Sequence, residues 1–338
     1  MSEPCRRSRG DLRRQMLAGA ASVVLVVATQ ASFAGAGTTA RTASSSVVTA
    51  DVRGSLGVET LPTDLTPSVA SASTDTALVG TPSLSNCNIV VQAIVVSKCV
   101  FGDTSGKHTM FLWGDSHAFM WFPALNAIAT AARWKLVTLM AYGCPVADVS
   151  VWDNLTNTSY TACDSFRSTV IRIINKLKPT LVVVAEAFTS YAASGHGAPG
   201  TISTHQWKTG LERSLALVHA KGMKKVVLGS TVLGGTASPP QCLAANPTAV
   251  QSCTVMDTPD QQAQRAAEAA AAKADKALYV NTLPWLCSPT TTQPACSPVI
   301  GDSMNGYMIV YYSAGHLTET YDLFLQGVLG AALKRDMR

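Results

Sequence analysis

A serine at position 116 stands in a context that suits nucleophilic catalysis. The tetrad Gly114-Asp115-Ser116-His117 follows a short apolar run at 109–113, and apolar residues then recur at helical spacing as far as Ala132. A serine in such a strand-to-helix turn lies at the carboxyl edge of a sheet and at the amino end of a helix. Free backbone N–H groups and the helix dipole can stabilise an oxyanion there. We therefore predict that Ser116 is a nucleophile.

A serine hydroxyl is a poor nucleophile at neutral pH, so this prediction requires a base from elsewhere in the chain. The chain has six histidines. One of them, His316, lies where a strand-like apolar run that starts at Tyr307 passes into the last helical segment. Ser116 and His316 both stand at strand-to-helix junctions, one early and one late. Such a pair is what a hydrolase or acyl-transfer site needs.

The elements around these residues predict a sheet that can bring them together. Apolar strands alternate with amphipathic helices, which is typical of a parallel sheet covered on both faces. Sites in such sheets lie beyond the carboxyl ends of the strands, which is where Ser116 falls. Strands are expected at 109–113, 135–140, 180–185, 224–229 and 278–281, and helices at 117–133, 163–178, 204–221, 258–276 and 317–334.

Three regions are less regular. Residues 37–86 are rich in Ser, Thr and Ala and are interpreted as a linker, ordered near the domain from about Leu61. Residues 230–257 have no clear period and are expected to cross the same sheet edge as a disulfide-closed loop. The alanine-rich run 262–276 predicts a surface helix without a functional role.

The amino end is typical of an export signal. Arginines precede an apolar run that begins at Met16, and small residues near Ala34 offer a cleavage site. No charge occurs between Arg14 and Arg41, so an uncleaved membrane anchor is the alternative. Either alternative places the remaining chain outside the cytoplasm, secreted or anchored to the outer face of the membrane. The expected division is 1–36 signal or anchor, 37–86 linker and 87–338 domain.

Composition narrows the classes of function. The chain has 338 residues, a formal charge of +5 and a charged fraction of 14%, which fits one domain of roughly 250 residues plus a leading segment. Much of the positive charge lies in the first fourteen residues, which does not favour nucleic-acid binding. No Cys-x-x-Cys motif occurs, so neither a metal nor a cofactor is predicted.

Cysteine usage agrees with an oxidising compartment. Apart from Cys5 in the signal region, eight cysteines are present, and eight cysteines allow 105 pairings in principle. They nevertheless fall into four close pairs along the chain. We therefore predict four local disulfides: Cys87–Cys99, Cys144–Cys163, Cys242–Cys253 and Cys287–Cys296.

With these residues in view, the chain resembles the SGNH hydrolases, relatives of the GDSL esterases. The nearer likeness is to the SGNH domain at the carboxyl end of family-three membrane acyltransferases, which O-acylate sugars of the cell envelope. The serine block is the most specific match, and the likeness covers residues from about 60 to 335. The matching pieces are Cys99-Val-Phe-Gly-Asp103, Leu112-Trp-Gly-Asp-Ser-His-Ala118, Trp121, Pro123, Gly143-Cys144-Pro145, Lys178-Pro179, Pro240-Gln-Cys-Leu-Ala244, Cys296-Ser-Pro-Val-Ile-Gly301 and His316-Leu317-Thr318.

The resemblance implies a fold and a site. The fold is a three-layer α/β/α sandwich with a mainly parallel, flavodoxin-like sheet. The site has Ser116 as nucleophile, His316 as base and an oxyanion hole formed by the N–H groups of Ser116 and Gly143.

Two positions depart from the family pattern. An acidic residue usually stands three residues before the histidine and orients its ring, but this chain has Ser313 there. The usual asparagine after the third strand is also not evident in Val184-Ala-Glu-Ala-Phe188. A backbone carbonyl or the Ser313 hydroxyl can accept the imidazole N–H, although neither stabilises an imidazolium as a carboxylate does. Carboxylates that could substitute from elsewhere in the fold are Glu186, Asp302 and Glu319.

The residues next to Ser116 in the sequence are expected to have structural roles. We expect Asp115 to cap the helix or fix the turn, and His117 to be structural, bonding across the turn. The aromatic residues Trp113, Trp121 and Phe122 are expected in the core or as a platform rather than in contact with substrate.

Together these observations predict an exported serine esterase or O-acyltransferase domain that acts on acyl esters of cell-envelope carbohydrate. Its expected partners are an acylated carbohydrate or other small ester and, if it transfers acyl groups, a membrane protein that donates them. The alternative is a catalytically impaired envelope module that binds glycan or a membrane acyltransferase partner, with Ser313 marking the lost activity.

Overall fold

A computed structural model describes residues 42–338, except 89–93, 155, 189–190, 196–197 and 235–237. The chain divides into two units, residues 1–39 and 40–338, and the described residues all belong to the second. The signal peptide or anchor predicted over 1–36 therefore lies outside the described residues. Within the described ranges, no helix combines the length and apolar character needed to cross a bilayer.

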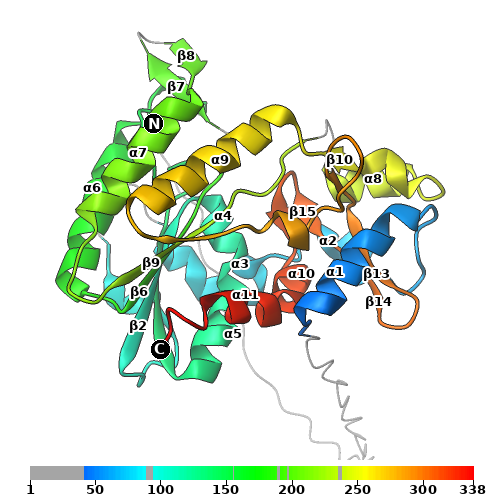
Figure 1. The fold of residues 1–338 in the computed structure, drawn as a ribbon, viewed down its shortest axis with the longest axis horizontal. Coiled ribbons are helices and arrows are strands. Elements are labelled where there is room, and N and C mark those ends of the chain that lie inside the picture. Colours follow the sequence, from blue (N-terminus) through cyan, green and yellow to red (C-terminus); the bar gives the residue numbers. More distant parts are fainter. Residues whose placement is uncertain (1–41, 89–93, 155, 189–190, 196–197, 235–237) are drawn as a thin grey trace, which may run out of the picture. The chain divides into compact units, whose positions relative to one another are not determined.

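Five parallel strands and one antiparallel edge strand form the central sheet of the described chain, in the order β1-β3-β2-β6-β9-β11 (Figure 1). In chain order the parallel strands have the arrangement 2-1-3-4-5, which is that of flavodoxin-like sheets. This confirms the predicted fold class. The strands are β1 (Val100–Gly102), β2 (His108–Gly114), β3 (Trp134–Met140), β6 (Leu181–Ala185), β9 (Lys224–Leu228) and β11 (Leu278–Val280).

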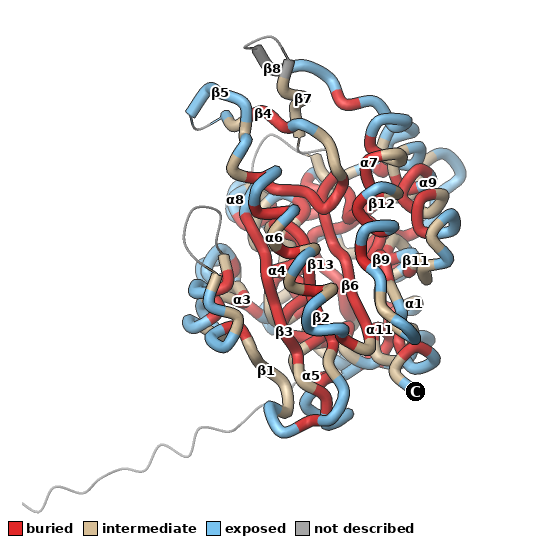
Figure 2. Tube along the Cα trace, turned by 90° about the vertical axis from the view of Figure 1, so that its left-hand side faces the viewer, coloured by how far each residue is buried: buried red, intermediate tan, exposed pale blue. Residues whose placement is uncertain are grey.

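Helices cover both faces of this sheet, as right-handed crossovers between parallel strands require (Figure 1). One face carries α6 (Thr161–Leu177), α7 (Thr204–Leu217) and α9 (Pro259–Ala274). The other carries α5 (Phe122–Ala132), α10 (Glu319–Phe324) and α11 (Gln326–Leu333), which pack on one another. Figure 2 shows the buried residues running along β2, β3 and β6 between these layers.

Two predicted helices are each broken into two. The segment predicted over 117–133 forms α4 (Ser116–Met120) and α5, separated at Trp121. Pro123 stands in the first turn of α5, where it lacks an N–H and would clash with the preceding turn of a continuous helix. The segment predicted over 317–334 likewise divides into α10 and α11 at Leu325. The helix predicted over 204–221 ends earlier, at Leu217.

The segment interpreted as a linker over 37–86 is ordered farther toward the amino end than predicted. In its described part, α1 (Ser45–Gly54) buries Val48 and Val52, and the N–H of Ala43 donates to the carbonyl of Phe324 at 3.0 Å. The apolar residues of α1 lie four apart and pack against the carboxyl-terminal part of the chain. Two short helices follow, α2 (Val69–Ala72) and α3 (Ala77–Gly80).

The four predicted disulfides are all present: Cys87–Cys99, Cys144–Cys163, Cys242–Cys253 and Cys287–Cys296. The third closes the 230–257 segment, whose described part includes α8 (Pro239–Ala245), a helix that the prediction did not contain. Short strand pairs occupy the loops: β4 (Trp152–Asp153) with β5 (Thr158–Ser159), β7 (Ala192–Gly195) with β8 (Ala198–Thr201), β10 (Val255–Met256) with β12 (Ala295–Cys296), β13 (Val299–Asp302) with β14 (Gly306–Ile309), and β15 (Tyr311–Ser313) with β16 (His316–Leu317).

Candidate active site

Ser116 is the first residue of α4 and follows directly on the sharp turn that ends β2. The turn requires glycine at position 114, because an added Cβ would lie 1.8 Å from the carbonyl oxygen of Ala185 on the neighbouring strand. Ser116 itself is only partly buried, whereas the residues around it are buried. The predicted nucleophile is thus held at the carboxyl edge of the sheet, at a helix amino end, with access to solvent.

His316 meets Ser116 across 200 residues of sequence. The imidazole Nε2 of His316 lies 2.8 Å from the Oγ of Ser116. The short β15–β16 hairpin presents the ring, and its turn residue Gly315 has φ +72°. A side chain at Gly315 would also collide with Leu233, because an added Cβ would lie 1.8 Å from the leucine Cδ2. The structure therefore brings together the two residues that the sequence paired.

The other ring nitrogen of His316 is held by its own hairpin. Nδ1 lies 3.0 Å from the carbonyl oxygen of Ala314 and 3.1 Å from the Oγ of Ser313. A carbonyl oxygen can only accept a hydrogen bond, so this arrangement places the proton on Nδ1. Nε2 is then unprotonated and accepts the hydroxyl proton of Ser116. A backbone carbonyl, assisted by Ser313, thus orients the histidine.

No carboxylate hydrogen-bonds to His316 in the described part of the chain. Glu186, predicted as a possible orienting group, is 2% exposed and its Oε2 accepts from the N–H of Ala147 at 2.9 Å. Burial raises the pKa of Glu186 well above its usual value. Glu186 is therefore not the group that orients the ring, because it is committed to the loop after β3.

The other two carboxylates considered from the sequence are also engaged elsewhere. Asp302 accepts the N–H groups of Met304 and Asn305 in the turn between β13 and β14. Glu319 begins α10, with its carboxylate against Gly80.

Asp115 is the carboxylate that acts on His316 through space. It is fully buried and accepts three hydrogen bonds: from the N–H of His117 at 2.7 Å, from the N–H of Ala187 at 2.8 Å, and from the hydroxyl of Tyr191. Burial raises the pKa of Asp115, and the three hydrogen bonds oppose that effect. The predicted helix cap is confirmed, and the same side chain also ties the end of β6 to the nucleophile turn.

The two histidines of the site are both neutral at neutral pH. Burial, and secondly the neighbouring imidazole of His117, lower the pKa of His316 to about 4, while Asp115 opposes the shift. Burial likewise lowers the pKa of His117 to about 4. The two rings lie 4.5 Å apart between centroids. The backbone N–H of His117 donates to the Asp115 carboxylate across the turn at 2.7 Å, and a structural role for its ring stays a prediction. A neutral His316 can accept a proton, although such a low pKa makes it a weak base.

The predicted oxyanion donors stand at the ends of neighbouring strands. Gly114 of β2 pairs in register with Met140 of β3, so Ser116 and Gly143 follow directly beyond one sheet edge. Gly143 has φ +66°, a conformation that favours glycine. The preceding residue is fixed on both sides, since Tyr142 donates its N–H to Asn88 and accepts from the hydroxyl of Tyr160. This loop can therefore present an N–H near the serine.

Two residues that the sequence analysis did not identify hydrogen-bond to the residues around the serine–histidine pair. Tyr191 donates to Asp115, and Thr231 donates its hydroxyl to the carbonyl of Gly315 at 2.7 Å. Neither stands in a recognisable motif, so no signal in the sequence could have found them. The aromatic residues Trp113, Trp121 and Phe122 are each 1% exposed or less, which confirms their place in the core.

Comparison with known proteins shows the family of the chain. A family model described as "SGNH domain (fused to AT3 domains)" matches residues 86–329, and the chain belongs to this family. The periplasmic domain of a lipopolysaccharide acetyltransferase from Salmonella ser. Paratyphi A is similar in structure, with a TM-score of 0.56 at 16% identity, over 80% of this chain and 98% of that chain. A GDSL-like lipase from Bacteroides thetaiotaomicron VPI-5482 matches with a TM-score of 0.36 at 17% identity, over 77% of this chain and 98% of that one.

A search of curated protein sequences finds no match. Of the two structural likenesses, only the first is strong enough to bear on the fold. Family membership supports an acyl-transfer or hydrolase activity. The four disulfides indicate that the domain folds in an oxidising compartment.

Proposed function

We propose that the chain is an exported serine esterase or O-acyltransferase domain that acts on acyl esters of cell-envelope carbohydrate. The observation that carries this proposal is the 2.8 Å contact between Ser116 Oγ and His316 Nε2 at the carboxyl edge of the sheet. The carbohydrate substrate is supported by the likeness to a lipopolysaccharide acetyltransferase domain and by the family's fusion to AT3 domains.

The proposed reaction uses four groups of the chain. Ser116 Oγ attacks the ester carbonyl while His316 Nε2 takes the hydroxyl proton. The N–H groups of Ser116 and Gly143 stabilise the oxyanion. His316 returns the proton to the departing alkoxide, which leaves an acyl-enzyme on Ser116. Water then releases the acid, or a sugar hydroxyl takes the acyl group, with His316 again as base.

Hydrolysis is the simpler outcome for the isolated chain, since water competes at every turnover. Transfer would require an acyl donor, for which we propose a membrane protein. The products separate the two reactions: free acid indicates hydrolysis, and a newly acylated sugar indicates transfer.

The direct test is the substitution Ser116→Ala, assayed with an aryl acetate and with acetylated xylan. We expect turnover to fall by about 10³-fold or more, because removal of an acyl-enzyme nucleophile removes the covalent route. Ser303→Ala, at an exposed hairpin turn, is the matched control and should keep full activity. Equal activity in the two variants would contradict the proposal.

A second function is favoured by one observation: among the described residues, no carboxylate is hydrogen-bonded to His316. A non-catalytic envelope module would bind glycan without turnover, and Ser116→Ala would leave that binding unaltered. Turnover of the esters by the unsubstituted chain, together with glycan binding by Ser116→Ala, therefore distinguishes the two functions.

A further inference from the structure

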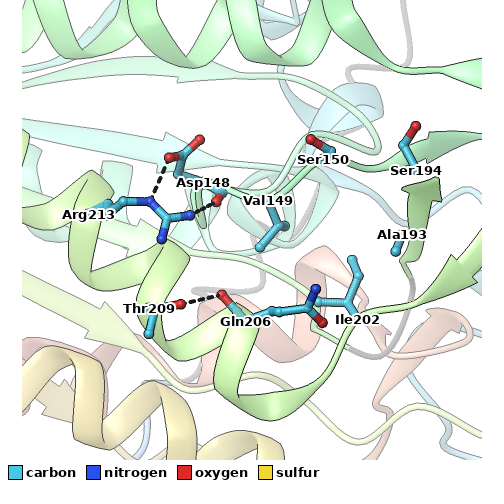
Figure 3. Close-up of a pocket in the computed structure, with 9 residues that line it drawn as sticks. All are labelled: Asp148, Val149, Ser150, Ala193, Ser194, Ile202, Gln206, Thr209 and Arg213. Carbon is cyan, nitrogen blue, oxygen red and sulfur yellow. Dashed lines mark hydrogen bonds and ion pairs between the residues drawn. The ribbon is translucent and has the colours of Figure 1, made fainter. Parts of the chain in front are cut away.

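A cavity of about 460 Å³ lies between α7, the loop that precedes β4, and β7 (Figure 3). Its volume is within the range of small-molecule sites, roughly 300 to 1,000 Å³. Asp148, Val149 and Ser150 contribute one wall, and Ala193 and Ser194 contribute another. The nucleophile and its histidine are not among the lining residues, so this cavity is a separate site.

The charges of the cavity are compensated within the protein. Arg213 donates from Nε to the Asp148 carboxylate at 2.8 Å and from Nη2 to the Asp148 carbonyl (Figure 3). The other carboxylate oxygen of Asp148 pairs with Arg167 at 3.2 Å, and Arg167 also pairs with Asp164 at 3.0 Å. Two arginines thus face two aspartates. The cavity therefore has no excess charge with which to select an ionic ligand.

Several polar groups of the cavity are nevertheless available. Gln206 uses its Oε1 to accept from Ser203 in the capping box of α7, and its Nε2 has no hydrogen-bond partner among the described residues. Within the same described part of the chain, the Oγ of Ser150 and the Nη1 of Arg213 are also without one. Ile202 adds an apolar surface beside them. Such a mixture of donors, hydroxyls and apolar carbon suits a ligand that carries hydroxyls on an apolar ring.

We propose that this cavity binds an uncharged sugar unit. A neutral sugar offers hydroxyl acceptors to Gln206 and Arg213 and C–H surface to Ile202, and it does not disturb the pairing of Arg213 with Asp148.

One wall of the cavity follows directly in the chain on a residue that contacts the proposed active site. Tyr191, which donates to the carboxylate of Asp115, lies directly before β7. A glycan whose ester is held at Ser116 could therefore place another of its sugar units in the cavity. This coupling rests on the proposed function, whereas sugar binding itself does not.

The binding test uses the full chain carrying Ser116→Ala, so that no turnover occurs. Calorimetry would measure the affinity for unacetylated xylotetraose, mannotetraose and cellotetraose, with tetragalacturonate as the charged comparison. Gln206→Glu keeps the Oε1 that closes the capping box and replaces the free amide donor by a carboxylate. Ser150→Trp places an indole in the cavity. Gln326→Glu makes the same exchange as Gln206→Glu at the first residue of α11, which packs on α5.

We expect at least one neutral tetrasaccharide to bind. Its dissociation constant should rise about tenfold in Gln206→Glu, as loss of a hydrogen bond to the sugar predicts. Binding should be lost in Ser150→Trp and retained in Gln326→Glu. The proposal is overturned if no neutral sugar binds, if tetragalacturonate binds best, or if Ser150→Trp binds as well as its parent. Should Ser150→Trp not fold, an unchanged affinity in Gln206→Glu overturns it.

Coupling to catalysis has its own test in the chain with Ser116 intact. The ratio of kcat/KM for acetylated xylotetraose to kcat/KM for an aryl acetate should fall about tenfold in Gln206→Glu. An unchanged ratio would contradict the coupling. If Ser116 proves not to be a nucleophile, the calorimetric result remains valid, so the two proposals can fail separately.

Discussion

Two clusters of polar side chains lie at the carboxyl edge of the sheet, and they differ in their access to solvent. In the first, His316 and Ser116 are partly exposed and lie in contact. In the second, the hydroxyl of Ser230 lies within hydrogen-bond distance of the Glu268 carboxylate and of the Glu186 carbonyl, and the N–H of Ser230 donates to Glu268 at 3.0 Å. Both glutamates are 2% exposed or less. The first cluster can meet a substrate, and the second is closed within the protein.

Burial acts on both clusters in the same physical direction, toward the neutral form. It lowers the pKa of His316 to about 4 and raises the pKa of Glu268 to about 7. The reason is that transfer of a charge from water into the protein costs free energy, whichever sign the charge has. What distinguishes a candidate catalytic group from a structural one is therefore access and a reactive neighbour rather than the pKa shift alone.

The largest effect expected in this comparison concerns the two histidines. His316→Gln should lower turnover of an aryl acetate by about 10³-fold, since it removes the group that takes the proton of Ser116. His117→Gln removes the neighbouring ring, which does not contact the serine, and should lower turnover less than tenfold. Thermal melts of both variants would show that each is folded. Similar losses in the two variants would contradict the role assigned to His316.

The second cluster should make the free energy of unfolding depend on pH. The native pKa of Glu268, about 7, lies above its usual value of 4.5, so its contribution is present below pH 4.5 and is lost as pH rises toward 7. The free energy of unfolding should fall by about 3 kcal/mol across that window, at 1.36 kcal/mol per pKa unit. Glu268→Gln should abolish this fall in urea titrations from pH 4.5 to 8.

Glu212→Gln, which removes a carboxylate paired with Lys208 on α7, is the matched control and should behave as the unsubstituted chain does. An equal pH dependence in Glu268→Gln and in the unsubstituted chain would show that Glu268 ionises normally and would contradict the contrast between the clusters.

The smallest expected effect comes from adding a carboxylate beside His316 in the first cluster. Ser313→Asp would bring a carboxylate to the Nδ1 side of His316, where Ser313 Oγ now lies 3.1 Å away. We expect kcat to rise about tenfold, because a carboxylate stabilises the imidazolium that forms in the reaction. The acid limb of kcat/KM, expected near pH 4 from the pKa of His316, should move to higher pH. Ser313→Asn, of equal size and without charge, should do neither. A faster asparagine variant would refute the electrostatic explanation.

Much of the fold could be predicted because local patterns agree with it. The five apolar runs became the five parallel strands, and the close spacing of the cysteines predicted all four disulfides. Predictions were wrong where packing outweighed composition. The alanine-rich run forms the predicted helix, α9, but composition gave no sign that its inner face would bury the charged residues Arg265 and Glu268. The polar amino-terminal segment folds as α1 because only two of its valines need to be buried.

The sequence by itself determined the five parallel strands, the approximate places of the helices between them, the disulfide partners and the two candidate reacting residues, because strand periodicity, turn chemistry and residue type are local properties. Only the tertiary structure decided which group holds the histidine ring, which carboxylates are buried and neutral, and which loops enclose a cavity. These depend on contacts between segments up to 200 residues apart, such as the one between Ser116 and His316. Local patterns in the sequence do not indicate how close such segments lie in the folded protein.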